Sequence, residues 1–348
     1  MKNFSLLLRR WFVDNARDLP WRHTTDPYHI WVSEIILQQT RVAQGIECYQ
    51  RFIERFRDIH TLSCASEEEV LKCWEGMGYY SRARNLHRAA QEMVRRFGGK
   101  FPQGYEDVRS LPGIGDYTAA AILSFAWEQP YAVVDGNVYR LLSRFFAIET
   151  PIDTTAGKKE FANLAASLLP EKEIGIHNQA VMEFGALHCV PRRPNCTACI
   201  LRDHCAAGGS NAELFPVKQR RTAVRNRYLN YFYILYKNNT WIRRRTEGDI
   251  WCGLYEFPLI ETSYAVTDFN ELTRTEDFRR LFGNADLFCV SPFPIVFKHI
   301  LSHQTLFASF YRIETDTVLE ELSDFICIAV EHLADYPFPR LFHRYLYG

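Results

Sequence analysis

The sequence carries no excess of charge of either sign, because 41 lysines and arginines balance 41 aspartates and glutamates. Overall charge therefore neither favours nor excludes a nucleic-acid partner, and any basic surface must be local. Long hydrophobic runs are also missing, since the first residues, MKNFSLLLRRWF, hold only a short apolar stretch followed by arginines. Such a stretch is too brief for a membrane-spanning helix and lacks the small-residue cleavage site of a signal peptide. We expect a soluble, intracellular protein with no membrane partner.

Internal repeats and low-complexity tracts are absent too, and 348 residues with 47% hydrophobic content can form one large core or two ordinary ones. From Phe4 to about Leu187, apolar residues recur at the three- and four-residue spacing of helices. The stretch DPYHIWVSEIILQQT predicts a helix with Asp26 as its cap and Pro27 in its first turn. The stretch SRARNLHRAAQEMVRRF predicts another helix, which ends at the glycine pair 98–99.

The composition changes after residue 208. The arginine-rich passage VKQRRTAVRNR is typical of a linker between domains. The stretches YLNYFYILYKNNTWIRRR, YEFPLI and HQTLFASFYRI that follow are rich in aromatic and β-branched residues, as strands are. We predict a mostly α N-terminal domain over residues 1–208, a basic linker over 209–225 and a smaller α+β domain over 226–348.

Four of the ten cysteines are clustered in CVPRRPNCTACILRDHC, with the spacing Cys-x6-Cys-x2-Cys-x5-Cys. Four thiols so close together favour a bound metal in a reducing compartment. Zinc knuckles use two Cys-x2-Cys pairs and only one is present, so the spacing favours an iron–sulfur cluster, with a zinc site as the alternative. The candidate ligands are Cys189, Cys196, Cys199 and Cys205. The remaining six are expected to be reduced packing residues: Cys48, Cys64, Cys73, Cys252, Cys289 and Cys327.

The stretch LPGIGDYTAAAI, residues 111–122, combines a Gly-x-Gly turn with the start of an alanine-rich helix. Gly113 and Gly115 leave backbone N–H groups unshielded, and the positive end of the helix dipole lies beside them. This is the pattern of a helix–hairpin–helix that binds one phosphate of DNA without reading the base sequence. An ordinary turn between two helices is the alternative.

Two carboxyl groups are candidates for acid–base chemistry. Glu34 lies in HIWVSEIILQQT, where helical spacing puts it beside Ile30, Trp31 and Gln38, and an apolar surrounding should raise its pKa. Asp135, in VVDGNVYR, is placed to cap a helix and should stay ionised. One acid and one anion suit the cleavage of a glycosidic bond. The alternatives are a core glutamate paired with an arginine and a simple turn-and-cap aspartate.

The chain resembles the endonuclease III superfamily of DNA glycosylases in several motifs and in the order in which they occur. These are SEIILQQT, GMGYYSRARNLHRAA, LPGIGDYTAAAI, VVDGNVYR and the cysteine spacing. Within it, the chain most resembles the mismatch-specific adenine DNA glycosylases, the MutY family. The resemblance extends to GLYEFP and HILSHQ, which match the extra C-terminal domain of that family. It implies a helix–hairpin–helix glycosylase domain with a 4Fe–4S cluster loop at 189–205, followed by a Nudix-like mismatch-recognition domain.

The resemblance also implies the activity. The enzyme would be a hydrolase of base excision repair, acting in the nucleoid as a monomer on double-stranded DNA. It would hydrolyse the N-glycosidic bond of adenine mispaired with 8-oxoguanine or guanine. In the lyase branch of the superfamily a lysine nucleophile stands at the position of Tyr117. A phenol forms no Schiff base, so water should be the nucleophile and the glycosylase should be monofunctional.

Residue roles follow from the same resemblance. Glu34 would protonate adenine at a ring nitrogen, Asp135 would stabilise the oxocarbenium sugar, and Asn137 would help to place them. The residues implied in binding the adenine, the base stack, the phosphate and the opposite base are Trp21, Arg22, Leu37, Gln38, Tyr79, Gln179, Gly113, Gly115, Ser302 and His303. Leu301 departs from the family's recognition loop, in which a phenylalanine precedes the serine and histidine.

Three other functions remain open at this point. One is a thymine or uracil mismatch glycosylase of the same superfamily, which the C-terminal domain disfavours. Another is a non-catalytic iron–sulfur protein that binds DNA or senses redox state, which the presence of both Glu34 and Asp135 disfavours. The last is a Nudix hydrolase, which needs a dense array of glutamates for magnesium. The nearest match, RTEDFRRLFG, has too few.

Overall fold

A computed structural model describes residues 2–219, 224–283, 285–301 and 303–348. The chain divides into two compact units, and each combines two segments. The first unit contains residues 1–64 and 85–220, and the second contains residues 65–84 and 221–348. The short segment 65–84 is therefore grouped with the C-terminal part of the chain, although the surrounding sequence is helical like the rest of the N-terminal part.

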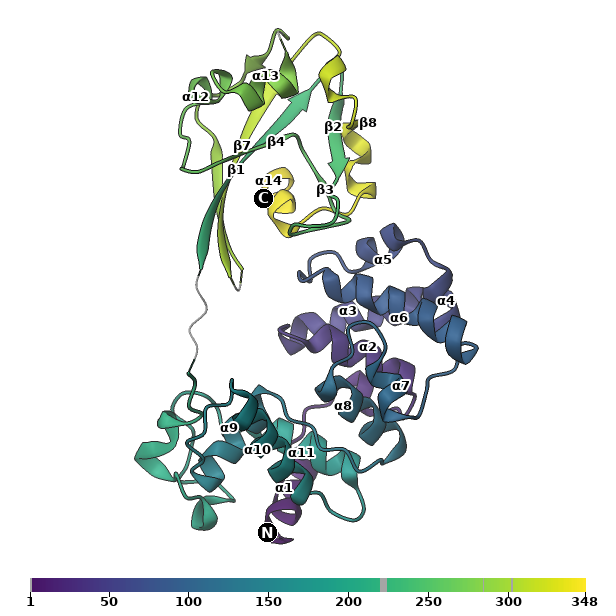
Figure 1. The fold of residues 1–348 in the computed structure, drawn as a ribbon, viewed down its shortest axis with the longest axis vertical. Helices are drawn as coiled ribbons and strands as arrows, with labels where there is room; N and C mark the ends of the chain where they lie inside the picture. Colours follow the sequence, from purple (N-terminus) through teal and green to yellow (C-terminus); the bar gives the residue numbers. More distant parts are fainter. Residues whose placement is uncertain (1, 220–223, 284, 302) are drawn as a thin grey trace. The chain divides into compact units, whose positions relative to one another are not determined.

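Helices dominate the described residues up to 219, as the apolar spacing predicted (Figure 1). The α-helices are α1 (Lys2–Asn15), α2 (Pro27–Leu37), α3 (Val42–Arg55), α4 (Ile59–Cys64), α5 (Glu67–Cys73), α6 (Ser81–Phe97), α7 (Tyr105–Arg109), α8 (Asp116–Trp127), α9 (Gly136–Phe146), α10 (Thr155–Ser167) and α11 (Ile174–Leu187). Short 3-10 turns are η1 (Pro20–Arg22), η2 (Arg202–His204) and η3 (Gly209–Leu214). None of the helices in the described ranges is both long and apolar enough to cross a membrane.

The predicted start of α2 and the predicted end of α6 are confirmed. The Asp26 side chain accepts a hydrogen bond from the backbone N of Tyr28 at 2.8 Å, and Pro27 is the first residue of α2. The α6 helix ends at Phe97, after which Gly98 and Gly99 have φ values of +61° and +77°. Because residues other than glycine rarely adopt such positive φ values, glycine is the residue suited to end the helix there.

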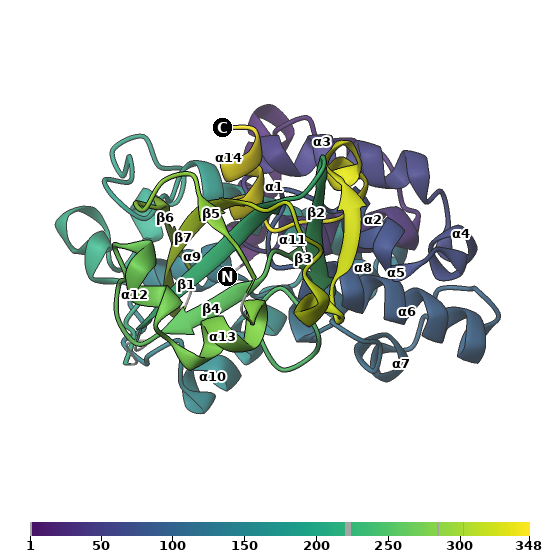
Figure 2. The same ribbon diagram turned by 90° about the horizontal axis from the view of Figure 1, so that it is seen from above.

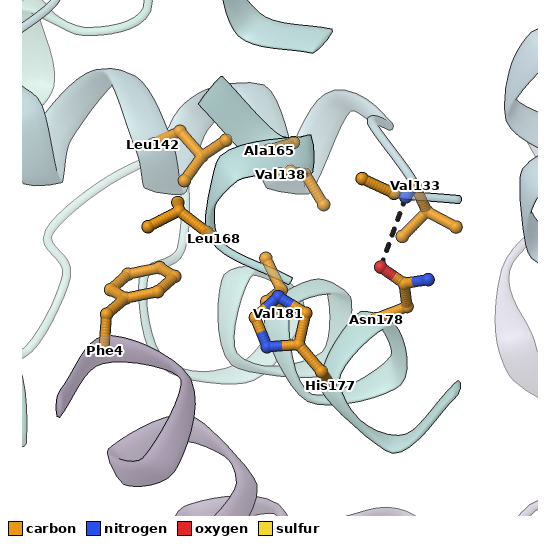
Figure 3. A pocket seen from close by; sticks show the side chains of 10 residues that line it. Phe4, Val133, Val138, Leu142, Ala165, Leu168, His177, Asn178 and Val181 are labelled. Carbon is orange, nitrogen blue, oxygen red and sulfur yellow. Dashed lines mark hydrogen bonds between the residues drawn. The ribbon is translucent and has the colours of Figure 1, made fainter. Parts of the chain in front are cut away.

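One hydrophobic cluster in the first unit is formed by residues of α1, α8, α9, α10 and α11. Figure 3 shows part of it, with Phe4 of α1 opposite Leu142 of α9 and Val181 of α11. Asn178 is a polar member of this core, and its Oδ1 accepts a hydrogen bond from the backbone N of Val133 at 3.3 Å (Figure 3). Its Nδ2 donates to the Tyr131 carbonyl at 2.8 Å. The chain just before position 135 is thus tied to α11.

The described residues of the second unit form two β-sheets. The larger sheet has the order β4-β1-β7-β5, with β6 also paired to β7; β1 and β7 are parallel and the other pairs are antiparallel. The smaller sheet has the order β3-β2-β8 and is antiparallel. The strands are β1 (Arg225–Leu235), β2 (Asn239–Arg244), β3 (Tyr255–Glu256), β4 (Leu259–Thr262), β5 (Phe288–Cys289), β6 (Ile295–Ile300), β7 (Gln304–Glu314) and β8 (Ile326–Ala329).

Helices cover both faces of the larger sheet (Figures 1 and 2). These helices are α12 (Phe269–Thr273), α13 (Glu276–Phe282) and α14 (Arg340–Leu346), with 3-10 turns η4 (Glu320–Leu322) and η5 (Val330–Asp335). Successive residues of β1 face opposite sides of the sheet, since Phe232 packs with α12 and α13 whereas Tyr231 packs with α14. Within this unit, Glu75 of the segment 65–84 pairs with His343 of α14 at 2.8 Å.

Candidate active site

A cleft of about 830 Å³ in the first unit brings together most of the predicted site residues. It is lined by η1, α2, the start of α8, the segment before α9, and α11. The predicted residues that line it are Trp21, Arg22, Glu34, Leu37, Gln38, Gly115, Tyr117, Asp135, Asn137 and Gln179. Residues far apart in the sequence therefore share one cavity large enough for a nucleobase and part of its sugar.

Glu34 is buried on α2, with 5% of its surface exposed. Its Oε2 accepts a hydrogen bond from the Tyr117 hydroxyl at 2.7 Å. Burial raises the pKa of Glu34 to about 7, although the hydrogen bond from Tyr117 acts in the opposite direction. Within the described ranges no arginine or lysine pairs with Glu34, so the alternative of a structural ion pair is wrong. A carboxyl with this pKa can hold a proton near neutral pH and release it.

Asp135 caps α9, as predicted. Its Oδ1 accepts hydrogen bonds from the backbone N atoms of Asn137 at 2.9 Å and Val138 at 2.8 Å. Its Oδ2 accepts a further bond from the Asn137 side chain at 2.7 Å. We expected Asp135 to stay ionised in an environment that contrasts with that of Glu34, and the two environments differ less than expected. Burial raises the pKa of Asp135 as well, and the three hydrogen bonds only oppose that rise.

Tyr117 lies in the first turn of α8 and points its hydroxyl at Glu34. Burial raises the pKa of Tyr117 well above its ordinary value, and the nearby carboxyl of Glu34 adds to the effect. The phenol therefore stays neutral and acts as a hydrogen-bond donor. Its hydroxyl also contacts the Met182 sulfur at 3.8 Å.

Gln38 differs from the expectation that helical spacing puts it beside Glu34. The α2 helix ends at Leu37, and Gln38 is the C-cap residue with φ −57° and ψ +108°. Its side chain still lines the cleft, and its Nε2 donates to Thr118 Oγ1 at 3.4 Å. Trp21 is 7% exposed and meets Tyr49 edge to face, with ring centroids 5.3 Å apart.

The cleft also contains charged residues that sequence reasoning missed, among them Arg17 and Glu183. Glu183 is 1% exposed and pairs with both Arg17 and Arg22. The only available signal was its position on α11, four residues after Gln179 and hence on the same face of the helix. Arg22, predicted to contact the base, is thus held by a carboxylate that the sequence did not identify.

The glycine turn before α8 has the expected backbone. Gly113 has a φ of +78°, and a Cβ there would lie 2.7 Å from the Asn85 Cβ, so glycine is required on both counts. Gly115 is the N-cap of α8 and makes no side-chain cap bond, and a Cβ there would meet nothing within 4 Å. The amides at the start of α8 are therefore not shielded by a capping side chain, which suits an anionic oxygen.

The four clustered cysteines line one small apolar cavity together with Leu141, Phe145 and Leu201. Arg144 Nη1 donates to the Cys189 sulfur at 3.4 Å. In the described part of the chain, no group of three or more metal-binding side chains is arranged to hold a single ion. A cubane cluster presents four separate iron corners, so its cysteines stand further apart than the ligands of one ion, and four thiols around a common apolar cavity fit that group.

A second cavity, of about 430 Å³, lies within the second unit. It is lined by Tyr79, Arg84, Trp251, Leu301 and His303, among others. Tyr79 is 45% exposed. The structure thus brings Tyr79 and His303 to one cavity, apart from the carboxyl cleft. Ser302, the other predicted recognition residue, lies outside the described residues.

Two domain families match parts of this chain. Residues 32–170 match the HhH-GPD superfamily of base excision DNA repair proteins, and residues 230–347 match the NUDIX domain. The adenine DNA glycosylase of Buchnera aphidicola subsp. Acyrthosiphon pisum (strain APS) is 36% identical over 257 residues, 73% of each chain. The enzyme of the Baizongia pistaciae strain is 34% identical over 308 residues, 87% of this chain and 84% of the relative. The chain belongs to the adenine DNA glycosylase family.

Membership of this family makes the protein a hydrolase of base excision repair and confirms the predicted fold class. The adenine DNA glycosylase of Mus musculus is 42% identical over 209 residues, 58% of this chain and 41% of the relative. Among solved structures, a thermostable thymine-DNA glycosylase has a TM-score of 0.56 at 30% identity, covering 59% of this chain and 94% of that chain. An endonuclease III–DNA complex has a TM-score of 0.51 at 23% identity over 59% of this chain and 92% of that chain, a likeness of fold.

Proposed function

We propose that the protein is a monofunctional adenine DNA glycosylase that removes adenine mispaired with 8-oxoguanine or guanine in double-stranded DNA. The observation that carries the proposal is a single cleft in which a carboxyl with a pKa near 7, Glu34, stands with a hydrogen-bonded carboxylate, Asp135. The residue at the nucleophile position of the lyase branch is Tyr117, which has no amine. We further propose that the enzyme acts as a monomer and works in the nucleoid.

In the first step, Glu34 gives its proton to a ring nitrogen of the extruded adenine. The bond between C1′ of the sugar and N9 of the base breaks, and its electron pair leaves with adenine. The positive charge left on the sugar is stabilised by the Asp135 carboxylate, which Asn137 orients through its amide groups. Tyr117 holds Glu34 by its hydroxyl and so fixes the direction of the acid.

In the second step, water adds to C1′. Glu34, now a carboxylate, accepts the proton that the water loses, which returns the enzyme to its starting state. No covalent bond to the protein forms, and the product strand keeps an intact abasic sugar. The cleft residues Trp21, Arg22, Leu37 and Gln179 are proposed to enclose the adenine during both steps.

The other predicted residues are proposed to position the DNA. Gly113 and Gly115 would present backbone N–H groups to one phosphate. Gln38 and Tyr79 would contact the base stack from which adenine is removed. Ser302 and His303 would read the base opposite the adenine. The position of His303 at a cavity that also contains Tyr79 supports this proposal.

The endonuclease III superfamily generally carries a 4Fe–4S cluster. We propose that Cys189, Cys196, Cys199 and Cys205 bind such a cluster here. When bound, the cluster would crosslink the loop. With its thiolates it would also present negative charge to neighbouring arginines. Arg144 would hold the loop through its bonds to the Cys189 sulfur and the Val190 carbonyl, at 3.4 and 2.8 Å.

The experiment that tests the proposed function uses duplexes that each contain one mismatch. The purified protein is incubated with A:8-oxoguanine, A:G, T:G, U:G and matched A:T duplexes, and abasic sites are then cleaved with alkali. We expect strand cleavage for the first two duplexes alone. Cleavage at T:G or U:G would favour a pyrimidine mismatch glycosylase, which the likeness to a thymine-DNA glycosylase makes the relevant alternative. Binding to all duplexes without cleavage would identify a non-catalytic DNA-binding protein.

The Tyr117→Lys variant should gain a borohydride-trapped complex with DNA that the wild-type protein lacks. An amine at this position would reach C1′ of the sugar and can form a Schiff base there, whereas a phenol cannot. The measurement is a gel-shifted covalent adduct after treatment with borohydride. Tyr117→Phe is the matched control, because it removes the bond to Glu34 without adding an amine. Efficient trapping by the wild-type protein would contradict a monofunctional mechanism.

The purified protein should be yellow-brown and contain iron and sulfide in near-equal amounts. Replacing Cys199 by serine should remove the colour, or reduce DNA affinity and solubility, because one corner of the cluster loses its ligand. Cys327→Ser is the matched control, since Cys327 is exposed and lies in the second unit. A colourless, active protein with one zinc per chain would show that the cluster assignment is wrong.

A further inference from the structure

A buried carboxylate holds two arginines at one side of the cleft. Glu183 Oε1 accepts hydrogen bonds from the Arg17 backbone N at 2.9 Å, from Arg17 Nε at 2.8 Å and from Arg22 Nη1 at 3.0 Å. Its Oε2 accepts from Arg17 Nη2 at 2.6 Å and Arg22 Nη2 at 2.9 Å. Burial acts to raise the pKa of Glu183, but the bonds from Arg17 and Arg22 outweigh it and lower the pKa to about 2. Glu183 is therefore ionised at any pH at which the enzyme works.

Arg22 is held on several sides. Besides its two bonds to Glu183, its Nη1 donates to the Arg17 carbonyl at 2.9 Å. Its guanidinium carbon lies 5.1 Å from the centre of the Phe12 ring, within the range of a cation–π contact. These contacts fix the guanidinium group in both position and orientation. An arginine without such partners at the edge of a solvent-filled cleft would be free to move.

Arg22 and Glu34 line the same cleft, yet in the described structure they form no ion pair or hydrogen bond with each other. The charged and titratable groups that act on Glu34 are Tyr117 of α8, Asp135 before α9, and Arg22 of η1. Of these, Arg22 is the cation, and its charge acts to lower the pKa of Glu34. The negative charge of Glu183 offsets one of the two positive charges of Arg17 and Arg22. Its carboxylate also binds the Arg22 guanidinium, which could otherwise turn toward Glu34.

We propose that Glu183 is a positioning residue that keeps the Arg22 guanidinium away from Glu34 and offsets its charge, so that Glu34 retains its proton for the reaction. The proposal rests on the proposed function, in which Glu34 is the acid. Without Glu183, the guanidinium groups of Arg17 and Arg22 would lack their carboxylate partner at the side of the cleft. Arg22 would then be free to pair with Glu34. A paired Glu34 would lose its proton at lower pH and could no longer protonate adenine at neutral pH.

The test is the pH dependence of single-turnover adenine excision by Glu183→Gln. Wild-type activity should fall as the pH rises through about 7, because the acid must be protonated. In the variant, that fall should occur about one pH unit lower. The rate should then be about tenfold below wild type at pH 8 but within about twofold at pH 5.5, after correction for bound DNA. A variant that is slower by one factor at every pH would overturn the proposal and leave Glu183 a purely structural role.

Two further variants keep the proposal testable if Glu183→Gln disturbs folding. Glu183→Asp retains the charge and should keep the wild-type pH profile. Arg22→Gln removes the cation, so the fall in activity should move to higher pH, and in the double variant with Glu183→Gln it should return to near the wild-type position. An unchanged profile in Arg22→Gln would contradict the proposal. Failure of the wild-type protein to excise adenine would instead contradict the proposed function, so the two failures are distinguishable.

Discussion

Single-turnover excision of adenine should fall by about a hundredfold or more in Glu34→Gln and in Asp135→Asn, while binding to the mismatched duplex stays close to wild type. A hundredfold loss corresponds to about 2.7 kcal/mol of transition-state stabilisation, within the range of one acid or one electrostatic group. Glutamine at position 34 can still accept a hydrogen bond from the Tyr117 hydroxyl but has no acidic proton to give to adenine. Asparagine at position 135 can still cap α9 through Oδ1 but has no charge to face the sugar cation.

The geometry also defines the control for these two variants. Asp135 Oδ2 accepts a bond from the Asn137 side chain, and an amide in its place would lose that one bond, at a cost of about 1 kcal/mol in stability. A melting curve and a binding isotherm therefore accompany the rate measurement. Glu47→Gln, on the exposed side of α3, is the matched control and should excise adenine at the wild-type rate. Near wild-type excision by either cleft variant would show that the assigned mechanism is wrong.

Replacing Ser302 and His303 together by alanine should lower the preference for 8-oxoguanine over guanine opposite adenine by about ten- to a hundredfold. Adenine itself is undamaged, so the signal must come from the opposite base. Oxidation makes N7 of guanine a donor and gives C8 a carbonyl acceptor. A serine hydroxyl both donates and accepts, and a histidine ring adds another bond, each worth about 1–3 kcal/mol of discrimination.

The measurement compares excision rates on A:8-oxoguanine and A:G duplexes for the same variant. The rate on A:G should change much less, because Glu34 and Asp135 lie in the other cavity and are untouched. His332→Ala removes an exposed histidine elsewhere in the second unit and should leave the preference unchanged. Equal losses on both duplexes would mean that the loop supports binding or folding in general, and would remove its recognition role.

Local features of the structure could be predicted from the sequence because short-range interactions determine them. Asp26 caps α2, and the glycines after Phe97 end α6. Both depend on residues within one turn of each other, where capping and backbone preference act. The end of α2 was placed too late, since no proline or glycine marks the point at which Gln38 leaves the helix.

The sequence by itself determined the helical and β-rich parts, the glycine turn, the cysteine spacing and the identity of the two candidate carboxyl residues. Tertiary structure alone decided their chemistry, because burial and long-range pairing depend on segments that meet only in the fold. It gave Glu34 a hydroxyl partner instead of an arginine, raised the pKa of Asp135 as well, and paired Arg22 with Glu183. It also grouped residues 65–84 with the C-terminal part of the chain. No local pattern encodes these outcomes, since desolvation and ion pairing are properties of packed neighbours.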